Sequence, residues 1–224
     1  MTGYPQRTVE AIHQCAGNPF EPTKPTRQIA NVVWGGVDLR SVLSAAGIES
    51  SAHAPNGAPL SLEHGYPVRL VVPGFYGTNS VKWICRLELA DRRPEGLFTT
   101  ELYNDPVDGG GTKPVWEVEP ESMFAFPEPG AKLDTSTHEI WGRAWSSSEI
   151  ASVEVSFDGG NAWSSARVTP RKQRAWQTFS IVWRPRAAGK YRLQRRATDE
   201  GGRSQPAAGA RNAIHSVDVV VESM

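Results

Sequence analysis

Cysteine is scarce in this sequence, which has only Cys15 and Cys85 among its 224 residues. They form no CxxC motif, and no pair of histidines stands at zinc-ligand spacing from them, so neither a disulfide framework nor a structural zinc site is supported. A CxxCH motif is also absent, and we expect no haem in this chain. Each thiol therefore has to be interpreted from its own surroundings.

The sequence also lacks net charge and long apolar runs. Its 24 Lys and Arg residues balance 24 Asp and Glu residues, which argues against nucleic acid or an anionic membrane surface as a partner. Apolar runs such as Leu70–Pro73 are far shorter than the ~20 residues that span a bilayer, so we expect no membrane association. The first residues show neither a secretory signal nor a twin-arginine motif, which predicts a cytoplasmic location.

The second half of the chain alternates apolar and polar residues between turn signals, which is typical of β-strands. Val153, Val155 and Phe157 face one way, and Asp158-Gly159-Gly160 then favours a tight hairpin. Six or seven short antiparallel strands predict an immunoglobulin-like β-sandwich. The other expected strands are Glu139–Trp145, Trp163–Val168, Trp176–Trp183, Tyr191–Thr198 and Ala213–Val221.

The first half mixes helix and strand signals. Helical spacing of apolar residues predicts a short helix that begins after Asp38 and ends before Gly47. Pro67–Pro73 and Val81–Leu89 are expected to be strands, and the loop between them has two glycines that let backbone amides approach a ligand. The fold class predicted for the whole chain is mainly β, with an α+β N-terminal part.

The two halves are joined by a stretch from Tyr103 to Pro120 that is rich in Pro, Gly and Asp. Such a composition suits neither a helix nor a sheet, so we expect a linker there. The predicted domains are residues 1–106 and residues 107–224, with the linker at the start of the second.

Cys15 is the first residue that could carry chemistry. It lies in His13-Gln14-Cys15-Ala16-Gly17-Asn18, where an apolar lead-in gives way to small residues, so its thiol is expected at the end of a strand. Taken alone, a free cysteine is more often a small buried hydrophobe than a ligand. Cys85, inside the apolar run Val81–Leu89, is expected to be part of the core.

Four segments occur in an order that resembles the sulfite-oxidase family of molybdenum-cofactor oxidoreductases: HQCAGN (13–18), VWGGVDL (33–39), HGYPVRLVVPG (64–74) and SVKW (80–83). The resemblance continues through Ile140-Trp141-Gly142 and on to Val219, so that it covers nearly the whole chain. It implies a partial cofactor domain followed by an immunoglobulin-like dimerisation domain.

The resemblance implies molybdenum–molybdopterin as the cofactor, with Cys15 as the protein ligand to the metal. A soft thiolate suits a metal that the cofactor's dithiolene already holds. His64 and Arg69 match positions that contact the molybdopterin, and Ser80-Val81-Lys82 match the segment that cradles its phosphate. From the residues alone, Arg69 in an apolar strand needs a partner or an exposed sheet face, and Lys82 could be a solvated edge residue.

The implied activity is oxygen-atom transfer to a small substrate such as sulfite, in a homodimer that passes electrons to a separate acceptor. The sequence departs from the family in two places, because only Met1–Gln14 precede Cys15 and a short turn-rich connection, Glu49–Leu62, replaces a longer segment. No counterpart of the family's active-site tyrosine or substrate-binding arginine is identified. Impaired activity is therefore expected. The alternatives are a non-catalytic dimerisation module and an unrelated carbohydrate-binding or adhesion sandwich that would use exposed tryptophans.

Overall fold

The computed structural model describes residues 4–16, 28–39, 41, 60–88, 91, 92, 95–107 and 109–223. The chain forms two compact units, of which unit 1 comprises residues 1–16 and 30–117 and unit 2 comprises residues 17–29 and 118–224. Most of the helix expected after Asp38, and most of the short connection 49–62, lie outside the described residues. Within the described residues, no helix has the length and apolar character needed to cross a bilayer.

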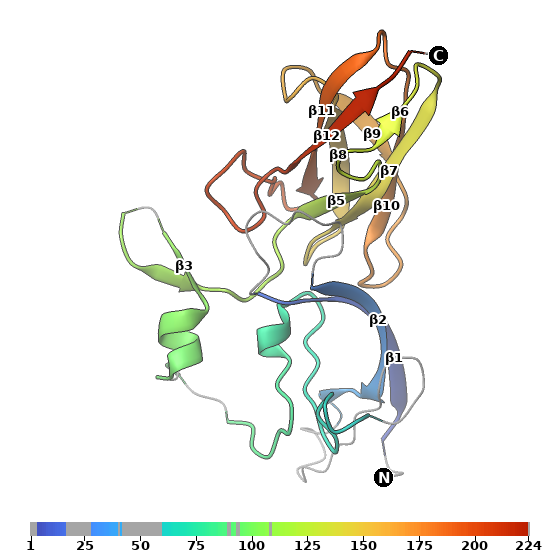
Figure 1. Cartoon of the computed structure of the whole chain (residues 1–224). Coiled ribbons are helices and arrows are strands. Elements are labelled where there is room, and N and C mark those ends of the chain that lie inside the picture. The colour runs from blue at the N-terminus through green and yellow to red at the C-terminus, as the bar shows by residue number, and fades with distance from the viewer. Residues whose placement is uncertain are drawn as a thin grey trace. The chain divides into compact units, whose positions relative to one another are not determined.

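Unit 2 is one continuous eight-stranded sheet that curls around its own core (Figure 1). Its strands follow the order β5-β7-β10-β9-β8-β11-β12-β6, and all neighbours pair antiparallel except β12 and β6. The predicted β-sandwich half of the chain is therefore confirmed. The strands are β5 (Glu121–Phe126), β6 (Lys132–Leu133), β7 (His138–Trp145), β8 (Ile150–Ser156), β9 (Ser164–Val168), β10 (Gln177–Trp183), β11 (Gly189–Asp199) and β12 (Ser216–Val221).

The core of unit 2 is filled by the alternate residues that the sequence pattern points inward. Ile140, Val153, Phe179 and Leu193 have no exposed surface. Gly142 lies where β7 crosses the Phe179 ring, and a Cβ atom there would be 2.0 Å from the Met123 carbonyl oxygen and 2.6 Å from the ring. Only glycine fits that crossing.

The hairpin predicted between β8 and β9 forms, but residues 157–163 connect the strands in place of the expected tight turn. Asp158 accepts hydrogen bonds from the Ser156 hydroxyl at 2.8 Å and from the Asn161 and Ala162 amides at 3.0 and 2.9 Å. Gly160 has a φ of 98°, a conformation that favours glycine. The Trp163 indole donates to the Gly160 carbonyl at 3.0 Å, so hydrogen bonds from side chains within the turn stabilise it.

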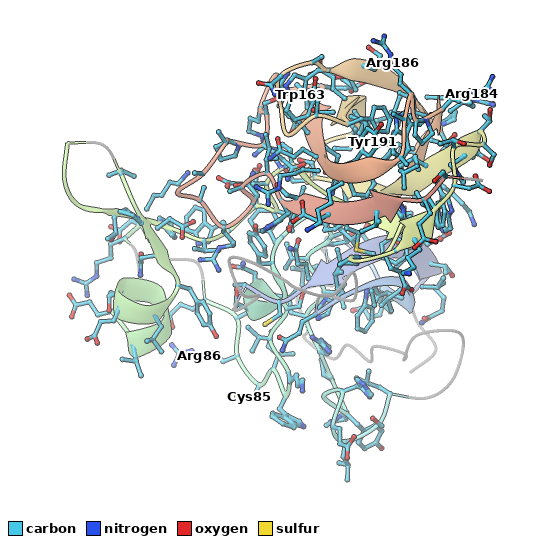
Figure 2. The ribbon with its side chains drawn as sticks, turned by 45° about the horizontal axis from the view of Figure 1, so that its top comes forward. Cys85, Arg86, Trp163, Arg184, Arg186 and Tyr191 are labelled. Atoms are coloured by element: carbon cyan, nitrogen blue, oxygen red, sulfur yellow. The ribbon has the colours of Figure 1, made fainter. Side chains whose placement is uncertain are left out.

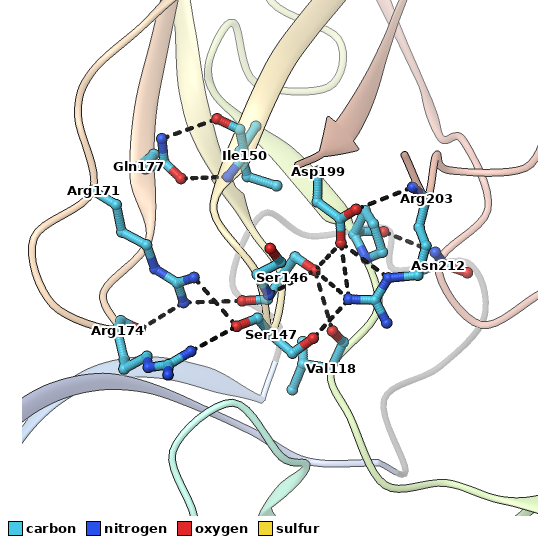
Figure 3. A network of polar contacts seen from close by, with 12 residues as sticks. Val118, Ser146, Ser147, Ile150, Arg171, Arg174, Gln177, Asp199, Arg203 and Asn212 are labelled. Carbon is cyan, nitrogen blue, oxygen red and sulfur yellow. Dashed lines mark hydrogen bonds and ion pairs between the residues drawn. The ribbon is translucent and has the colours of Figure 1, made fainter. Parts of the chain in front are cut away.

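A polar network closes one end of unit 2 (Figure 3). Asp199 is buried and accepts from the Ser146 hydroxyl at 2.8 Å and from the Arg203 guanidinium at 2.8 and 3.0 Å. Arg171 donates to the Ser146 carbonyl at 3.0 Å. The Ser147 amide donates to the carbonyl of Val118 at 2.8 Å. The network therefore fixes the start of unit 2 to its sheet.

Unit 1 contains less regular structure. Strands β1 (Gln6–Gln14) and β2 (Ile29–Val37) form a two-stranded sheet, followed by the 3-10 turn η2 (Gly77–Asn79) and the π-helical turn η3 (Phe98–Leu102). Two short strands, β3 (Asn104–Pro106) and β4 (Thr112–Pro114), then pair as a hairpin. The expectation that the stretch 103–120 holds no sheet was therefore wrong, because three glycines with positive φ (109–111) let the chain turn back on itself.

The two strands expected at Pro67–Pro73 and Val81–Leu89 are not regular strands. These segments meet at a single bridge between Arg69 and Lys82, supported by the Leu70 amide to Val81 carbonyl bond at 2.9 Å. Trp83 has a φ of 52°, which breaks the extended run and its alternation. Cys85 is consequently exposed and not part of the core, which corrects the sequence-based expectation (Figure 2).

Candidate cofactor site

Arg69 is the centre of the candidate site in unit 1. Its side chain is buried, and its guanidinium lies 5.0 Å from the centre of the Trp34 ring. Nη1 donates to the carbonyl of His64 and Nη2 donates to the carbonyl of Ser80, each at 3.2 Å. The arginine therefore ties together the two loops in which the sequence-predicted cofactor residues lie.

The described residues around Arg69 do not compensate its positive charge. Among the described residues, no carboxylate forms an ion pair with it, and its Nε has no hydrogen-bond partner. Burial lowers the pKa of Arg69 from its ordinary value. A buried cation without a counter-charge is unfavourable unless an anion binds beside it. The surroundings of Arg69 are thus suited to an anionic group.

His13 contacts Arg69 without adding charge to the site. Its Nε2 lies 3.4 Å from Nη2 of Arg69, and its ring meets the Trp34 ring edge-on, with 5.5 Å between the ring centres. Burial, and then the charges of Arg69 and Lys82, lower the pKa of His13 to about 4. The imidazole is therefore neutral at pH 7, and Arg69 and Lys82 are the described residues that place positive charge beside it.

His13 and Trp34 were not among the residues nominated from sequence. The alternation along β1 could have pointed to His13, because residues two apart share a face and His13 is two residues before Cys15. No local pattern could have joined either side chain to Arg69, which is 56 residues from His13 in the chain.

Cys15 directly follows β1, as expected for a thiol at the end of a strand. It is a free, half-buried cysteine, and its neighbours Gln14 and Ala16 have no exposed surface. The turn η2 packs on this strand, since a Cβ at Gly77 would lie 3.1 Å from Nε2 of His13 and 3.3 Å from the Gln14 carbonyl oxygen. Gly77 thereby lets the loop approach the strand that carries the thiol.

The structure gathers the other nominated residues around Arg69, but by their backbones more than their side chains. His64 is exposed and its ring lies 2.6 Å from the Ser61 hydroxyl, while its carbonyl meets Arg69. Ser80 is buried, and its hydroxyl accepts from the Val72 amide at 3.3 Å.

Val81 and Lys82 lie at the surface of the same loop pair. Half of the Val81 surface is exposed (50%), and its carbonyl accepts from Leu70. The ammonium of Lys82 donates to the Glu63 carbonyl at 2.5 Å and lies 5.7 Å from the centre of the Trp83 ring. In the described part of the chain, no group of three or more His, Cys, Asp or Glu side chains could by itself hold a metal ion.

The fold and this site define a two-unit, mainly β protein with a half-buried thiol and a buried arginine in its first unit. Two family profiles match it: "Oxidoreductase molybdopterin binding domain" over residues 1–55 and 50–98, and "Mo-co oxidoreductase dimerisation domain" over residues 112–221. The sulfite oxidase of Gallus gallus is 27% identical over 267 aligned positions, covering 91% of this chain. The mitochondrial sulfite oxidase of Macaca fascicularis is 32% identical, covering 99% of this chain.

Among solved structures, the sulfane dehydrogenase SoxCD of Paracoccus pantotrophus superposes with a TM-score of 0.80 at 28% sequence identity, covering 95% of this chain and 69% of that one. The chain belongs to the sulfite-oxidase family of molybdopterin-dependent oxidoreductases. It spans 58% and 54% of the length of the two sulfite oxidases, respectively.

Proposed function

We propose that this chain binds a molybdenum–molybdopterin cofactor in unit 1 and acts as an oxidoreductase of the sulfite-oxidase type. The observation that carries the proposal is the buried Arg69 guanidinium, whose charge has no carboxylate partner among the described residues. A phosphate on the cofactor would supply the missing anion. Arginine and lysine with nearby backbone amides are a common phosphate-binding combination.

The residues of this chain fit such a cofactor in two further ways. Cys15 offers one soft sulfur ligand at a half-buried position, which suits a metal whose remaining donors come from the cofactor. Gly77 leaves room between η2 and β1, close to His13. When bound, the group supplies oxygen-atom transfer coupled to a two-electron change, and the protein's part is to orient it and surround it with positive charge.

The substrate proposed for this chain is a small sulfur oxyanion such as sulfite. Support comes from the names of the relatives, which are sulfite oxidases and a sulfane dehydrogenase. We further propose that the chain is a homodimer through unit 2, which matches the dimerisation profile, and that a separate molecule accepts the electrons.

A second candidate is a non-catalytic dimerisation module or an enzyme with weak activity. The alignment with the Macaca fascicularis protein has 295 positions against 224 residues here, so at least 71 positions are occupied only by the relative. The cofactor-domain profile also matches in two pieces that overlap at residues 50–55. Both observations support the loss of an internal segment from the cofactor domain, and losing even one preorganised charge at a reacting oxygen commonly costs ~10²-fold in rate.

The experiment is expression in a host that makes molybdopterin, followed by measurement of molybdenum per chain and of the fluorescent pterin released on oxidation. We expect Cys15→Ser to lower metal content and Arg69→Gln to lower pterin content. The exposed Arg192, which pairs with Asp218 on unit 2, gives the matched control Arg192→Gln. Wild-type protein without molybdenum or pterin would refute cofactor binding.

Sulfite-dependent reduction of an artificial electron acceptor then separates the two candidates. Stoichiometric metal with strong turnover that Cys15→Ser abolishes would refute impairment. Bound cofactor without turnover would favour the second candidate.

A further inference from the structure

The outer face of strands β5, β7 and β10 has an unusual composition for a solvated surface. On β7, the core-facing Ile140 and Ala144 alternate with Glu139, Trp141 and Arg143, which point away from the core. Val182 on β10 is 70% exposed and is the one large apolar side chain found exposed among the described residues of unit 2. We call this surface the β7 face and define it by its outward residues: Met123, Glu139, Trp141, Arg143, Trp176, Thr178, Ser180 and Val182.

Arg143 is held rigidly at the centre of the β7 face. Its guanidinium lies 5.2 Å from the centre of the Trp141 ring and 5.7 Å from that of the Trp176 ring. It also donates a hydrogen bond to the hydroxyl of Thr178, its cross-strand neighbour. Arginine and tryptophan are enriched at the energetic centres of protein interfaces, and a side chain fixed in advance loses little entropy on binding.

The charged residues of the β7 face are complementary to those of the same face on a second copy. Glu139 and Arg143 flank Trp141 on either side along the same strand, each about 7 Å away. Neither belongs to an ion pair among the described residues. Consider a two-fold axis that lies in the contact plane, perpendicular to β7 and level with Trp141. It would place the β7 strand of the second copy antiparallel to the first. Trp141 would then face its counterpart, and Glu139 of each copy would face Arg143 of the other.

We infer that the β7 face is the surface through which a second copy of this chain docks. The inference rests on the homodimer in the proposed function and adds the surface and its pairing. A two-fold contact uses the same patch on both copies, so a patch with one acidic and one basic residue placed symmetrically about an aromatic anchor suits it. The dimerisation profile covers β7 and β10 completely.

The test is sedimentation equilibrium of the full chain and of charge-reversal variants. Glu139→Arg and Arg143→Glu should each raise the dimer dissociation constant by about tenfold or more, because every single reversal places two like-charge pairs in the contact. The double variant, Glu139→Arg with Arg143→Glu, should restore most of the affinity. Arg192→Glu, an exposed reversal on β11, is the matched control and should leave the dissociation constant unchanged.

Thermal unfolding shows whether each variant is folded. If Arg143→Glu is destabilised because it loses its contacts with Trp141 and Trp176, Glu139→Arg still tests the proposal. A wild-type dimer that Glu139→Arg does not weaken would overturn the assignment of the face while leaving the homodimer intact. A wild-type monomer would overturn both. The molybdenum and pterin measurements are independent of either result.

Discussion

Asp199 offers the sharpest test of how unit 2 is held together. Its carboxylate accepts four hydrogen bonds: Oδ2 from the Ser146 hydroxyl at 2.8 Å and from Nε and Nη2 of Arg203 at 3.0 and 2.8 Å, and Oδ1 from the Arg203 amide at 3.0 Å. The substitution Asp199→Asn keeps the shape and replaces one oxygen by an NH₂ group. In either orientation that group faces a donor, either the amide or the guanidinium of Arg203, so the bonds cannot all reform.

The expected cost of Asp199→Asn is about 2–4 kcal/mol of unfolding free energy. Hydrogen bonds to a charged group contribute roughly 1.5–3 kcal/mol each, and an unsatisfied buried group adds to the loss. The Arg203 side chain is 40% exposed, so water can replace some of its lost hydrogen bonds and reduce the cost. The Asp199 side chain is fully buried and has no such replacement. The expected loss of unfolding free energy is therefore well below the summed contributions of the four hydrogen bonds.

The cost should also depend on pH. Burial raises the pKa of Asp199, but hydrogen bonds from Ser146 and Arg203, together with the charge of Arg203, outweigh it and leave the pKa below its ordinary value. A carboxylate with a depressed folded-state pKa stabilises the protein above its unfolded pKa of about 3.9, and the stabilisation is lost as the pH falls through the folded value. The gap between wild type and Asp199→Asn should narrow below about pH 4.

Urea unfolding of both proteins at pH 7 and at acid pH, followed by tryptophan fluorescence, measures these effects. Asp218→Asn is the control, because its ion pair with Arg192 is exposed and such pairs contribute about 0–1 kcal/mol. Equal unfolding midpoints for Asp199→Asn and Asp218→Asn at pH 7 would refute the reasoning.

Three further outcomes are expected. Gly142→Ala should prevent folding of unit 2 or cost about 3 kcal/mol or more, seen as a lowered Tm, because the new methyl group meets the Met123 carbonyl and the Phe179 ring; an unchanged Tm would contradict this. Gly77→Ala should lower molybdenum content with little change in the Tm, since the neighbouring His13 ring needs to shift by only a few tenths of an ångström but lies next to the strand end that carries Cys15; full metal content would contradict it. Limited proteolysis should cut first between Asn104 and Pro120, and an earliest cut between Val153 and Val168 would show that the expected linker is misplaced.

The strands of unit 2 could be predicted because each has one face on the core. The alternation of Val153 and Val155 with polar residues survives intact in β8, and the Asp158-Gly159-Gly160 turn fixes its hairpin locally. The same reasoning predicted strands at 67–73 and 81–89 wrongly. These segments pair only at one bridge, and the left-handed backbone of Trp83 ends the alternation of faces. Cys85 was misassigned for this reason.

The sequence predicted some members of the candidate site, although not His13 or Trp34, and none of its contacts. The motif segments named Cys15, His64, Arg69 and Lys82, but the clustering depends on contacts between residues far apart in the sequence. Arg69 lies against Trp34 and His13 because β1 and β2 pack on the loops that contain His64 and Ser80. The alternation of residues along the sequence does not predict this packing. Both terminal nitrogens of Arg69 donate to backbone carbonyls, Nη1 to that of His64 and Nη2 to that of Ser80.

That geometry gives Arg69 two separable roles, and the substitution Arg69→Lys distinguishes them. Lysine keeps the positive charge, but a single ammonium cannot reproduce a planar group that reaches the carbonyls of His64 and Ser80 at once. Losing one net hydrogen bond costs about 1 kcal/mol, so we expect cofactor affinity to fall roughly five- to tenfold. Pterin content should then fall between wild type and Arg69→Gln, while Lys82→Arg, which keeps an exposed cation, should retain the cofactor. Wild-type pterin content in Arg69→Lys would mean that charge alone holds the anion and that the bonds to the two carbonyls are incidental.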